Sequence, residues 1–333
     1  MNGAAGKNIL PAGSVNTAAA GNADVSRAHG SENAGQASTR GADPEALECS
    51  HASECVIALD IGGTFIKSGL YADGQLCRTV KTPTGSDSLE SLLRSVSAAV
   101  ETQLDKSESC CGIAVSSAGD IDPYTGRCLY ATDNLKGYSG FAIREWLEEK
   151  YEMRASAIND GHAALLGEAS YRGLTCPTVM LTLGTGVGGA YYDGKKIVFG
   201  PDFRYGRFGH LCLRKNGRRC NCGQQGCIEQ YVSATALAAE CALAGTAPER
   251  VFTETLPRSR RIVEEWLDLL AEAMETVYRA QPYELMIFGG GVCGSAELWL
   301  PLLRQKTRFR AEVSSLGNSA GLEGAYRWWC EHE

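Results

Sequence analysis

Short apolar runs that end in glycine or in polar residues recur along the chain, and such runs are typical of buried strands. The first of them, Cys55-Val-Ile-Ala-Leu59, ends at Asp60. Two further runs, 66–71 and 76–80, flank Asp73-Gly74, a two-residue turn that joins neighbouring strands into a hairpin. The pattern therefore predicts three successive antiparallel strands at the start of the folded part.

Helical spacing of apolar residues appears in the segments between the later runs. In 88–104 and 261–279 large apolar side chains recur every three or four residues, which places them on one face of a helix. Because strands and helices alternate after the first hairpin, we predict an α/β fold with helices packed over mostly parallel sheets. The pattern restarts after Asn159-Asp160 with a helix followed by further strands, which indicates two related lobes. Shorter helices are expected at 140–150 and 161–171, and further strands at 112–115, 155–158, 178–183, 189–192, 195–198 and 285–288.

Residues 1–53 lack this pattern. Ala, Gly, Asn and Ser make up 29 of the first 50 residues, too little apolar surface to offset the entropy of ordering, so a disordered polar tail is expected. Ile9-Leu10 is followed at once by Pro11, which is too short an apolar run for a secretory signal. No run reaches the roughly 18 apolar residues of a membrane span. We therefore expect a cytoplasmic protein.

The charge balance argues against a nucleic-acid partner. The 333 residues carry a formal net charge of −7 at pH 7, whereas a nucleic-acid phosphate backbone requires a basic face. A local basic cluster, Arg214, Lys215, Arg218 and Arg219, lies inside a cysteine-rich segment and is best interpreted as a solvated charge run.

Three glycine-rich turns follow predicted strands. Asp60-Ile-Gly-Gly-Thr64 could let backbone N–H groups approach a phosphate, but taken alone it is equally a plain tight turn. Leu183-Gly-Thr-Gly-Val-Gly-Gly189 has more glycine than a reversal needs, and it is no dinucleotide fingerprint because a strand follows it. Gly289-Gly-Gly291 ends the apolar strand 285–288. Three such turns together predict a nucleotide clamp.

Asn159-Asp160 stands between a predicted strand and a predicted helix. Asn and Asp are the preferred residues at helix N-termini, so an ordinary cap accounts for the pair when it is taken alone. The same position also suits a carboxylate that projects into a cleft between lobes.

The sharpest chemical signal is Gly209-His210 followed by Cys220-Asn-Cys222-Gly-Gln-Gln-Gly-Cys227-Ile-Glu229. One imidazole and three thiols make up the four N/S ligands of a closed tetrahedral zinc site, and the two glycines allow the short loop to wrap an ion. The chain has 14 cysteines. In a cytosolic protein this dense spacing favours metal over disulfides, and the scattered cysteines are expected to be buried apolar side chains.

Together these segments closely resemble the ROK family (repressor, open reading frame, kinase). The resemblance covers about residue 54 to the C-terminus and includes Ser117-Ala118-Gly119, Asn134-Leu-Lys-Gly-Tyr-Ser-Gly140 and Asn159-Asp160. It implies an actin-like, ribonuclease-H-like fold of hexokinase type, with two lobes closing over a sugar and ATP with magnesium. The lobes implied are 54–158, rejoined by a C-terminal helix at 317–333, and 159–316 with a zinc-binding loop at 206–229.

The resemblance also assigns residues to the nucleotide. It implies that Asp60 approaches the magnesium ion through water, and it adds Lys67 to the ATP site. The first phosphate loop would be Gly62, Gly63 and Thr64, the second Gly184, Thr185, Gly186 and Gly188, and the adenosine would face Gly290 and Gly291.

For the sugar, the resemblance implies Asp160 as the general base that accepts the proton of the attacking hydroxyl, expected at O6 of a hexose or N-acyl-hexosamine. The residues implied to surround the sugar are Gly119, Asn134, Asn159, Arg207, His210 and Glu229. A structural zinc ion bound by His210, Cys220, Cys222 and Cys227 would hold this loop in shape.

One position departs from the family pattern. Sugar kinases of the family commonly carry Gly-Glu-x-Gly-His where this sequence has Gly206-Arg207-Phe-Gly-His210, so a hydrogen-bond acceptor is replaced by a cation with five donors. Arg207 is expected either to pair with Glu229 or with a carbonyl or carboxylate of the substrate, or to mark a degraded sugar site. A sugar sensor without catalysis is therefore the main alternative to a kinase.

The family also contains transcriptional repressors with an N-terminal helix-turn-helix. Residues 1–53 have no amphipathic helix pair, so a repressor is the least favoured class. Dimers are common among members of the family, which makes a homodimer an expectation from the resemblance and not from these residues.

Overall fold

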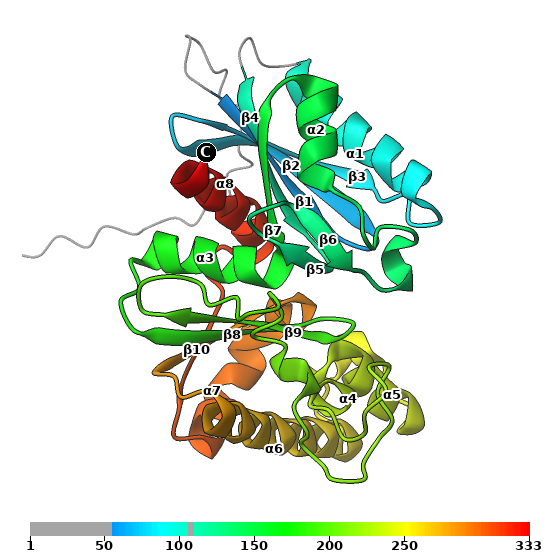
Figure 1. Cartoon of the computed structure of the whole chain (residues 1–333). Coiled ribbons are helices and arrows are strands. Elements are labelled where there is room, and N and C mark those ends of the chain that lie inside the picture. Colours follow the sequence, from blue (N-terminus) through cyan, green and yellow to red (C-terminus); the bar gives the residue numbers. More distant parts are fainter. Residues whose placement is uncertain (1–54, 106–109) are drawn as a thin grey trace, which may run out of the picture. The chain divides into compact units, whose positions relative to one another are not determined.

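The computed structural model describes residues 55–105 and 110–333 (Figure 1). The predicted tail at 1–53 lies outside the described residues. The described residues belong to one compact unit, so the lobe boundaries at 158 and 316 stay a prediction. Within 55–105 and 110–333, no helix is both long and apolar enough to cross a membrane.

The first sheet has five strands in the order β3-β2-β1-β4-β7. The first three are antiparallel, as the hairpin pattern predicts, and β4 and β7 then run parallel to β1. The strands are β1 (Cys55–Ile61), β2 (Phe65–Ala72), β3 (Gln75–Pro83), β4 (Cys110–Ser117) and β7 (Arg154–Asn159).

Alternate side chains of β1 face two different layers. Ile57 and Leu59 pack with α1 (Leu89–Leu104) and α2 (Ile143–Tyr151) on one face. Val56 and Ala58 pack with α8 (Ala320–His332) on the other face. Because both faces are covered, the strand is apolar without interruption, which explains why the sequence shows a continuous run there.

The second sheet has the order β11-β10-β8-β9, with β8 and β9 antiparallel and the other neighbours parallel. The restart of the pattern is thus confirmed, with one strand fewer. The segment 195–198 forms no strand, and only Ile197 pairs with Tyr192. The strands are β8 (Pro177–Leu183), β9 (Val187–Asp193), β10 (Leu285–Gly289) and β11 (Arg310–Val313).

Helices also cover both faces of the second sheet. One face packs on the long amphipathic helix α6 (Pro257–Ala280) and on α7 (Ala296–Lys306), with α4 (Glu229–Val232) and α5 (Ala234–Leu243) beside them. The other face packs on α3 (Asp160–Arg172). The short hairpin of β5 (Asp120–Asp122) and β6 (Arg127–Tyr130), which the sequence pattern does not predict, lies at the end of the first sheet near α3 (Figure 1).

Helices α3 and α8 pack against each other between the two sheets (Figure 1). Their close approach depends on glycine, because a Cβ on Gly324 would overlap the carbonyl of Ala163, and a Cβ on Gly167 would lie 2.7 Å from the carbonyl oxygen of Ala320. The chain enters the second sheet through α3 and returns to the first through α8. The N-terminus of α3 is therefore held where the two sheets meet.

Candidate active site

Asp160 is the first residue of α3 and directly follows β7. Asn159 caps the helix, since its Oδ1 accepts hydrogen bonds from the N–H groups of Gly161 (3.0 Å) and His162 (3.1 Å). Its side-chain amide donates to Oδ1 of Asp160 (2.9 Å) and to the carbonyl of Gly119 (2.8 Å). The cap that the sequence predicts is present, and the capping residue also orients the neighbouring carboxylate.

A cavity of about 180 Å³ opens on one side of Asp160. We call it the Arg207 cavity. Of the residues implied for sugar binding, five line this cavity, and Asn134 and Glu229 do not. The five are Gly119, Asn159, Asp160, Arg207 and His210.

A second cavity, of about 190 Å³, opens on the other side of Asp160. We call it the Asp60 cavity, and Lys67, Gly290 and Asn318 are also part of its lining. Asp160 and Gly161 line both cavities. A compound in each cavity would therefore meet the same carboxylate.

Asp60, at the end of β1, is held by two donors. Its Oδ2 accepts from Nζ of Lys67 (2.9 Å), and its Oδ1 accepts from the hydroxyl of Ser116 on β4 (2.9 Å). The Lys67 ammonium also donates to the carbonyl of Asn318 (3.1 Å), just before α8. The first sheet and the segment that precedes α8 are thus joined at the Asp60 cavity.

The glycine turns have different surroundings. Gly290 lines the Asp60 cavity with φ +87°, and a Cβ there would lie 2.6 Å from the carbonyl oxygen of Leu183, so only glycine fits. Gly188 lines the Arg207 cavity. The other residues implied for ATP line neither cavity; they are Gly62, Gly63, Thr64, Gly184, Thr185, Gly186 and Gly291.

Two residues implied for the sugar contact the glycine turns instead. Glu229 accepts a hydrogen bond from the N–H of Val187 (2.9 Å), and a Cβ on Gly186 would collide with its carboxylate. Asn134 lies beside the first turn, because a Cβ on Gly63 would be 3.2 Å from the Asn134 Cβ. Both side chains therefore support the shape of a turn, and their contact with a sugar stays a prediction.

Arg207 pairs with Asp120 and not with Glu229. One guanidinium nitrogen of Arg207 lies 3.7 Å from Oδ2 of Asp120, and Nε of Arg204 donates to the same oxygen at 2.8 Å. The Asp120 side chain is 12% exposed, whereas that of Arg207 is 42% exposed. Arg207 therefore keeps donors available to a compound in the cavity.

The carboxyl group of Asp160 has a perturbed pKa. Enclosure by the surrounding protein raises the pKa of Asp160 to about 6, and the negative charge of Asp60 acts in the same direction. The hydrogen bonds from Gly161 and Asn159 limit this increase. A carboxylate with this pKa is ionised at neutral pH and is a stronger base than an ordinary aspartate.

The four predicted metal ligands come together. The ligand atoms of His210, Cys220, Cys222 and Cys227 all lie within 4.8 Å of one another. The sulfurs of Cys222 and Cys227 are 3.6 Å apart, and Nδ1 of His210 is 3.7 Å from the sulfur of Cys220. Ligands at about 2.3 Å from a tetrahedral ion would be separated by about 3.8 Å, so the donor set fits zinc in type and spacing.

The family model named "ROK family" matches residues 56–332 of this chain. The chain belongs to the ROK family. An N-acetylmannosamine kinase of Escherichia fergusonii is 30% identical over 285 residues, which are 81% of this chain and 96% of the relative. A beta-glucoside kinase of Klebsiella pneumoniae is 29% identical over 286 residues, which are 81% of this chain and 94% of that protein.

Solved ROK structures have the same fold. A ROK family glucokinase from Streptomyces griseus, solved in complex with glucose and AMPPNP, superposes with a TM-score of 0.69 at 26% identity, covering 81% of this chain and 97% of that one. The predicted two-lobed, actin-like fold is therefore confirmed for this ROK chain.

Sequence reasoning missed three polar residues of the site. Asp120 follows the Ser-Ala-Gly motif but lies in a hairpin that no pattern announces. Ser116, on β4, reaches Asp60 from a neighbouring strand. Asn318 arrives from a segment 251 residues away from Lys67. Only Asp120 had a usable signal in the sequence, because this acidic residue directly follows Ser117-Ala118-Gly119.

Proposed function

We propose that this ROK protein is an ATP-dependent sugar kinase in which Asp160 is the general base. The observation that carries the proposal is the position of Asp160, which lines both the Arg207 cavity and the Asp60 cavity. A sugar in the first cavity and the terminal phosphates of ATP in the second would meet at this carboxylate. The kinase activity named for both relatives supports the same conclusion.

The reaction moves one phosphoryl group and one proton. The sugar hydroxyl attacks the γ-phosphorus, its proton passes to Oδ2 of Asp160, and the bond between the γ-phosphorus and the β–γ bridging oxygen breaks to release ADP. Oδ2 is free for this task because the described residues donate their hydrogen bonds to Oδ1. A pKa of about 6 keeps Asp160 ionised at neutral pH.

The Asp60 cavity supplies the phosphate side. Lys67 provides an ammonium group, and Asp60 provides a carboxylate that would hold a magnesium ion, directly or through water. Magnesium that binds with ATP neutralises charge on the phosphates during transfer. The glycine turns would present backbone N–H groups to the nucleotide, with Gly290 and Gly291 facing the adenosine.

A structural zinc ion is part of the proposal. It would join His210 to Cys220, Cys222 and Cys227, with no position open for water. His210 also lines the Arg207 cavity, so the metal would fix one wall of the sugar site. The same loop carries Glu229, which supports the second glycine turn through Val187.

For the substrate we propose a hexose or an N-acyl-hexosamine phosphorylated at O6. Arg207 supports an N-acylated or otherwise carbonyl-bearing sugar, because its donors face the cavity while Asp120 balances its charge. The N-acetylmannosamine kinase activity of one relative agrees with this preference.

The deciding experiment is an ATP-consumption assay of the full chain across hexoses and N-acyl-hexosamines, run in parallel with Asp160→Asn. We expect sugar-dependent ADP release that the variant lacks. The sensor alternative rests on Arg207, which lines the cavity at a position where sugar kinases of the family commonly carry a glutamate. Sugar binding by calorimetry without ADP release for any sugar in the panel would favour the sensor and refute the kinase.

A further inference from the structure

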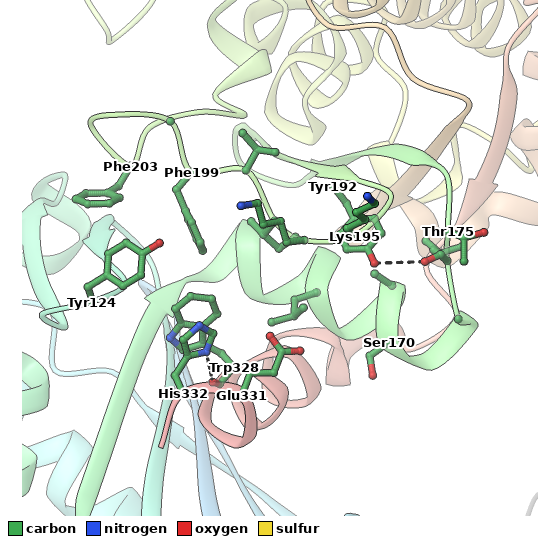
Figure 2. Close-up of a pocket in the computed structure, with 18 residues that line it drawn as sticks. Tyr124, Ser170, Thr175, Tyr192, Lys195, Phe199, Phe203, Trp328, Glu331 and His332 are labelled. Atoms are coloured by element: carbon green, nitrogen blue, oxygen red, sulfur yellow. Dashed lines mark hydrogen bonds between the residues drawn. The ribbon is translucent and has the colours of Figure 1, made fainter.

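A larger cavity, of about 630 Å³, lies away from the two that meet at Asp160. It is bounded by the outer face of α3, by the segment 195–203 after β9, by the turn of the β5–β6 hairpin and by the end of α8 (Figure 2). This volume is within the range of sites that hold small metabolites. The cavity has no role in the proposed kinase reaction.

Aromatic rings gather at one end of this cavity (Figure 2). Tyr124, from the hairpin turn, packs edge-to-face near Phe203 (5.9 Å between centroids) and Phe199 (6.4 Å). Phe199 in turn packs edge-to-face on Trp328 of α8 (5.3 Å). Tyr124 is nevertheless 62% exposed, so its ring is available to stack on a ligand.

Polar groups at this cavity lack partners. Lys195 and Lys196 are exposed, and neither forms an ion pair with a carboxylate within the described part of the chain. Glu331 is the single carboxylate in the lining. Asp193, just outside it, accepts hydrogen bonds from the backbone N–H groups of both lysines and interacts electrostatically with their ammonium groups. Trp328 is only 5% exposed, yet its indole N–H has no hydrogen-bond partner among the described residues. A ligand with an anionic group would pair with the two exposed ammonium groups.

The walls of this cavity continue into the Arg207 cavity. The hairpin that presents Tyr124 begins at Asp120, and the segment that presents Phe203 continues into Arg204, whose Nε donates to Asp120 at 2.8 Å. Phe203 has a φ of +59°, an unusual backbone conformation for a bulky residue. The Arg204–Asp120 pair therefore joins two segments that each run from one cavity to the other.

A second connection runs through α3. The ring of His162 packs edge-to-face on Phe199 (5.0 Å), and its Nε2 lies 2.9 Å from the carbonyl oxygen of Tyr205. His162 stands two residues after Asp160 on the same helix. A ligand that holds Phe199 in place would therefore also hold the start of α3.

We propose that the 630 Å³ cavity is a second ligand site for a small phosphorylated compound that carries a ring, and that its occupation strengthens sugar binding at the Arg207 cavity. The ring stacks on the exposed face of Tyr124, and the phosphate pairs with Lys195 and Lys196. Because the ligand bridges the hairpin and the segment 195–203, it stabilises the Arg204–Asp120 pair at the edge of the sugar site. By linkage, a sugar must strengthen the binding of this ligand by the same factor.

Calorimetry on the full chain carrying Asp160→Asn, which prevents turnover, tests the site. The probes are a hexose 6-phosphate and AMP, which share a ring and a phosphate, with inorganic phosphate and adenosine as partial probes. We expect one of the two complete probes to bind. The double variant Lys195→Ala with Lys196→Ala should weaken the affinity for this probe about tenfold or more. The matched control, Arg258→Ala with Arg260→Ala, removes two exposed cations from the start of α6 and should leave binding unchanged.

Two further measurements distinguish this site from a nonspecific anion-binding surface and from a dimer interface. Tyr124→Ala, at an exposed position, should weaken the binding of the complete probe and leave the affinity for inorganic phosphate unchanged. The bound probe should lower the Kd of the sugar about fivefold or more, and Arg204→Ala should abolish this effect. The proposal is overturned if neither complete probe binds, if both double variants behave alike, or if light scattering shows a dimer that Tyr124→Ala converts to a monomer, since a second copy then covers the cavity. Binding is measured without catalysis, so its failure is distinct from failure of the kinase proposal.

Discussion

The side-chain amide of Asn159 donates a hydrogen bond of 2.9 Å to Oδ1 of Asp160. The N–H of Gly161 donates a second, of 2.8 Å, to the same oxygen. One oxygen of the carboxylate is therefore committed to the helix N-terminus, and Oδ2 accepts no hydrogen bond from the other described residues. This division between the two oxygens is what the proposed proton transfer requires.

Replacing Asp160 by Asn should remove the base and keep the shape of the site. We expect kcat to fall about 10² to 10⁴ fold, the usual contribution of a general base, with the sugar Kd changed by less than about threefold. Steady-state kinetics and calorimetry measure the two quantities. Asp105→Asn, at the exposed end of α1, is the matched control and should retain full kcat. Full activity in the Asp160 variant would remove this residue from its role.

The pH dependence should report the raised pKa of Asp160. Because the base acts in its ionised form, kcat/KM should rise with pH through about 6 and level off above that value. The negative charge of Asp60 contributes to the raised pKa, so Asp60→Asn should move this acid limb to lower pH, even though the variant is slower overall. A limb at the same pH in both proteins would show that Asp160 is not the group that titrates.

Removing one of the four clustered donors should release the proposed zinc. We expect the purified protein to hold about one zinc per chain, and Cys222→Ser to lose most of it, to unfold at a lower temperature and to raise the sugar KM through the wall that carries His210. Metal analysis, thermal unfolding and kinetics measure these effects. Cys212→Ser is the control, because Cys212 is exposed and lies beside the cluster without belonging to it. A fully active Cys222 variant without metal would contradict the prediction.

Arg207 should decide which sugars are preferred. Arg207→Glu restores the acceptor that the family commonly carries there, and it should move the ratio of kcat/KM for glucose over N-acetylmannosamine towards glucose by about tenfold, or about 1.4 kcal/mol. Comparison of both sugars on the same preparations measures this ratio. Arg204→Gln removes the other partner of Asp120 and should shift the ratio less, because Arg204 does not line the Arg207 cavity. An unchanged ratio of kcat/KM in Arg207→Glu would mean that other residues determine the sugar preference.

Local patterns made most of the strands and helices predictable, because their signals lie within a few residues. The run at β1, the Asp73-Gly74 turn and the spacing of α1 each correspond to an observed element. The prediction of a strand at 195–198 was wrong, because only Ile197 of this segment pairs with β9, through a single bridge to Tyr192. Contacts between distant segments, such as Lys67 with Asn318, depend on how α8 returns to the first sheet, and no local pattern encodes them.

The cluster of His210, Cys220, Cys222 and Cys227 and the place of Asp160 at the start of α3 could be predicted from sequence, because motifs with fixed spacing carry these residues. The partner of Arg207 could not, since Asp120 and Arg207 are on different elements that only the fold brings together. Single residues in motifs are thus easier to predict from sequence than the ion pairs that they form with residues on other elements.

Glu168 should be a positioning residue for the Asp60 cavity. Its fully buried carboxylate accepts from Nε of Arg172 (2.6 Å), from the hydroxyl of Ser314 (2.6 Å) and from the N–H of Leu316 (2.8 Å). It thereby ties α3, which begins at Asp160, to the segment that leads to Asn318. Glu168→Ala should lower the free energy of unfolding by about 3 kcal/mol, because three donors lose their acceptor and Arg172 loses a buried partner.

A structural role alone would leave the kinetics of the folded fraction unchanged, whereas positioning would not. We expect Glu168→Ala to raise the KM for ATP more than the KM for the sugar, because Asn318 and Lys67 line the Asp60 cavity, and Glu168→Gln to restore part of both stability and KM. Glu90→Ala is the matched control, since its pair with Arg94 is exposed on both sides and contributes less than about 1 kcal/mol. Equal changes in both KM values would mean that Glu168 stabilises the fold without placing the nucleotide site.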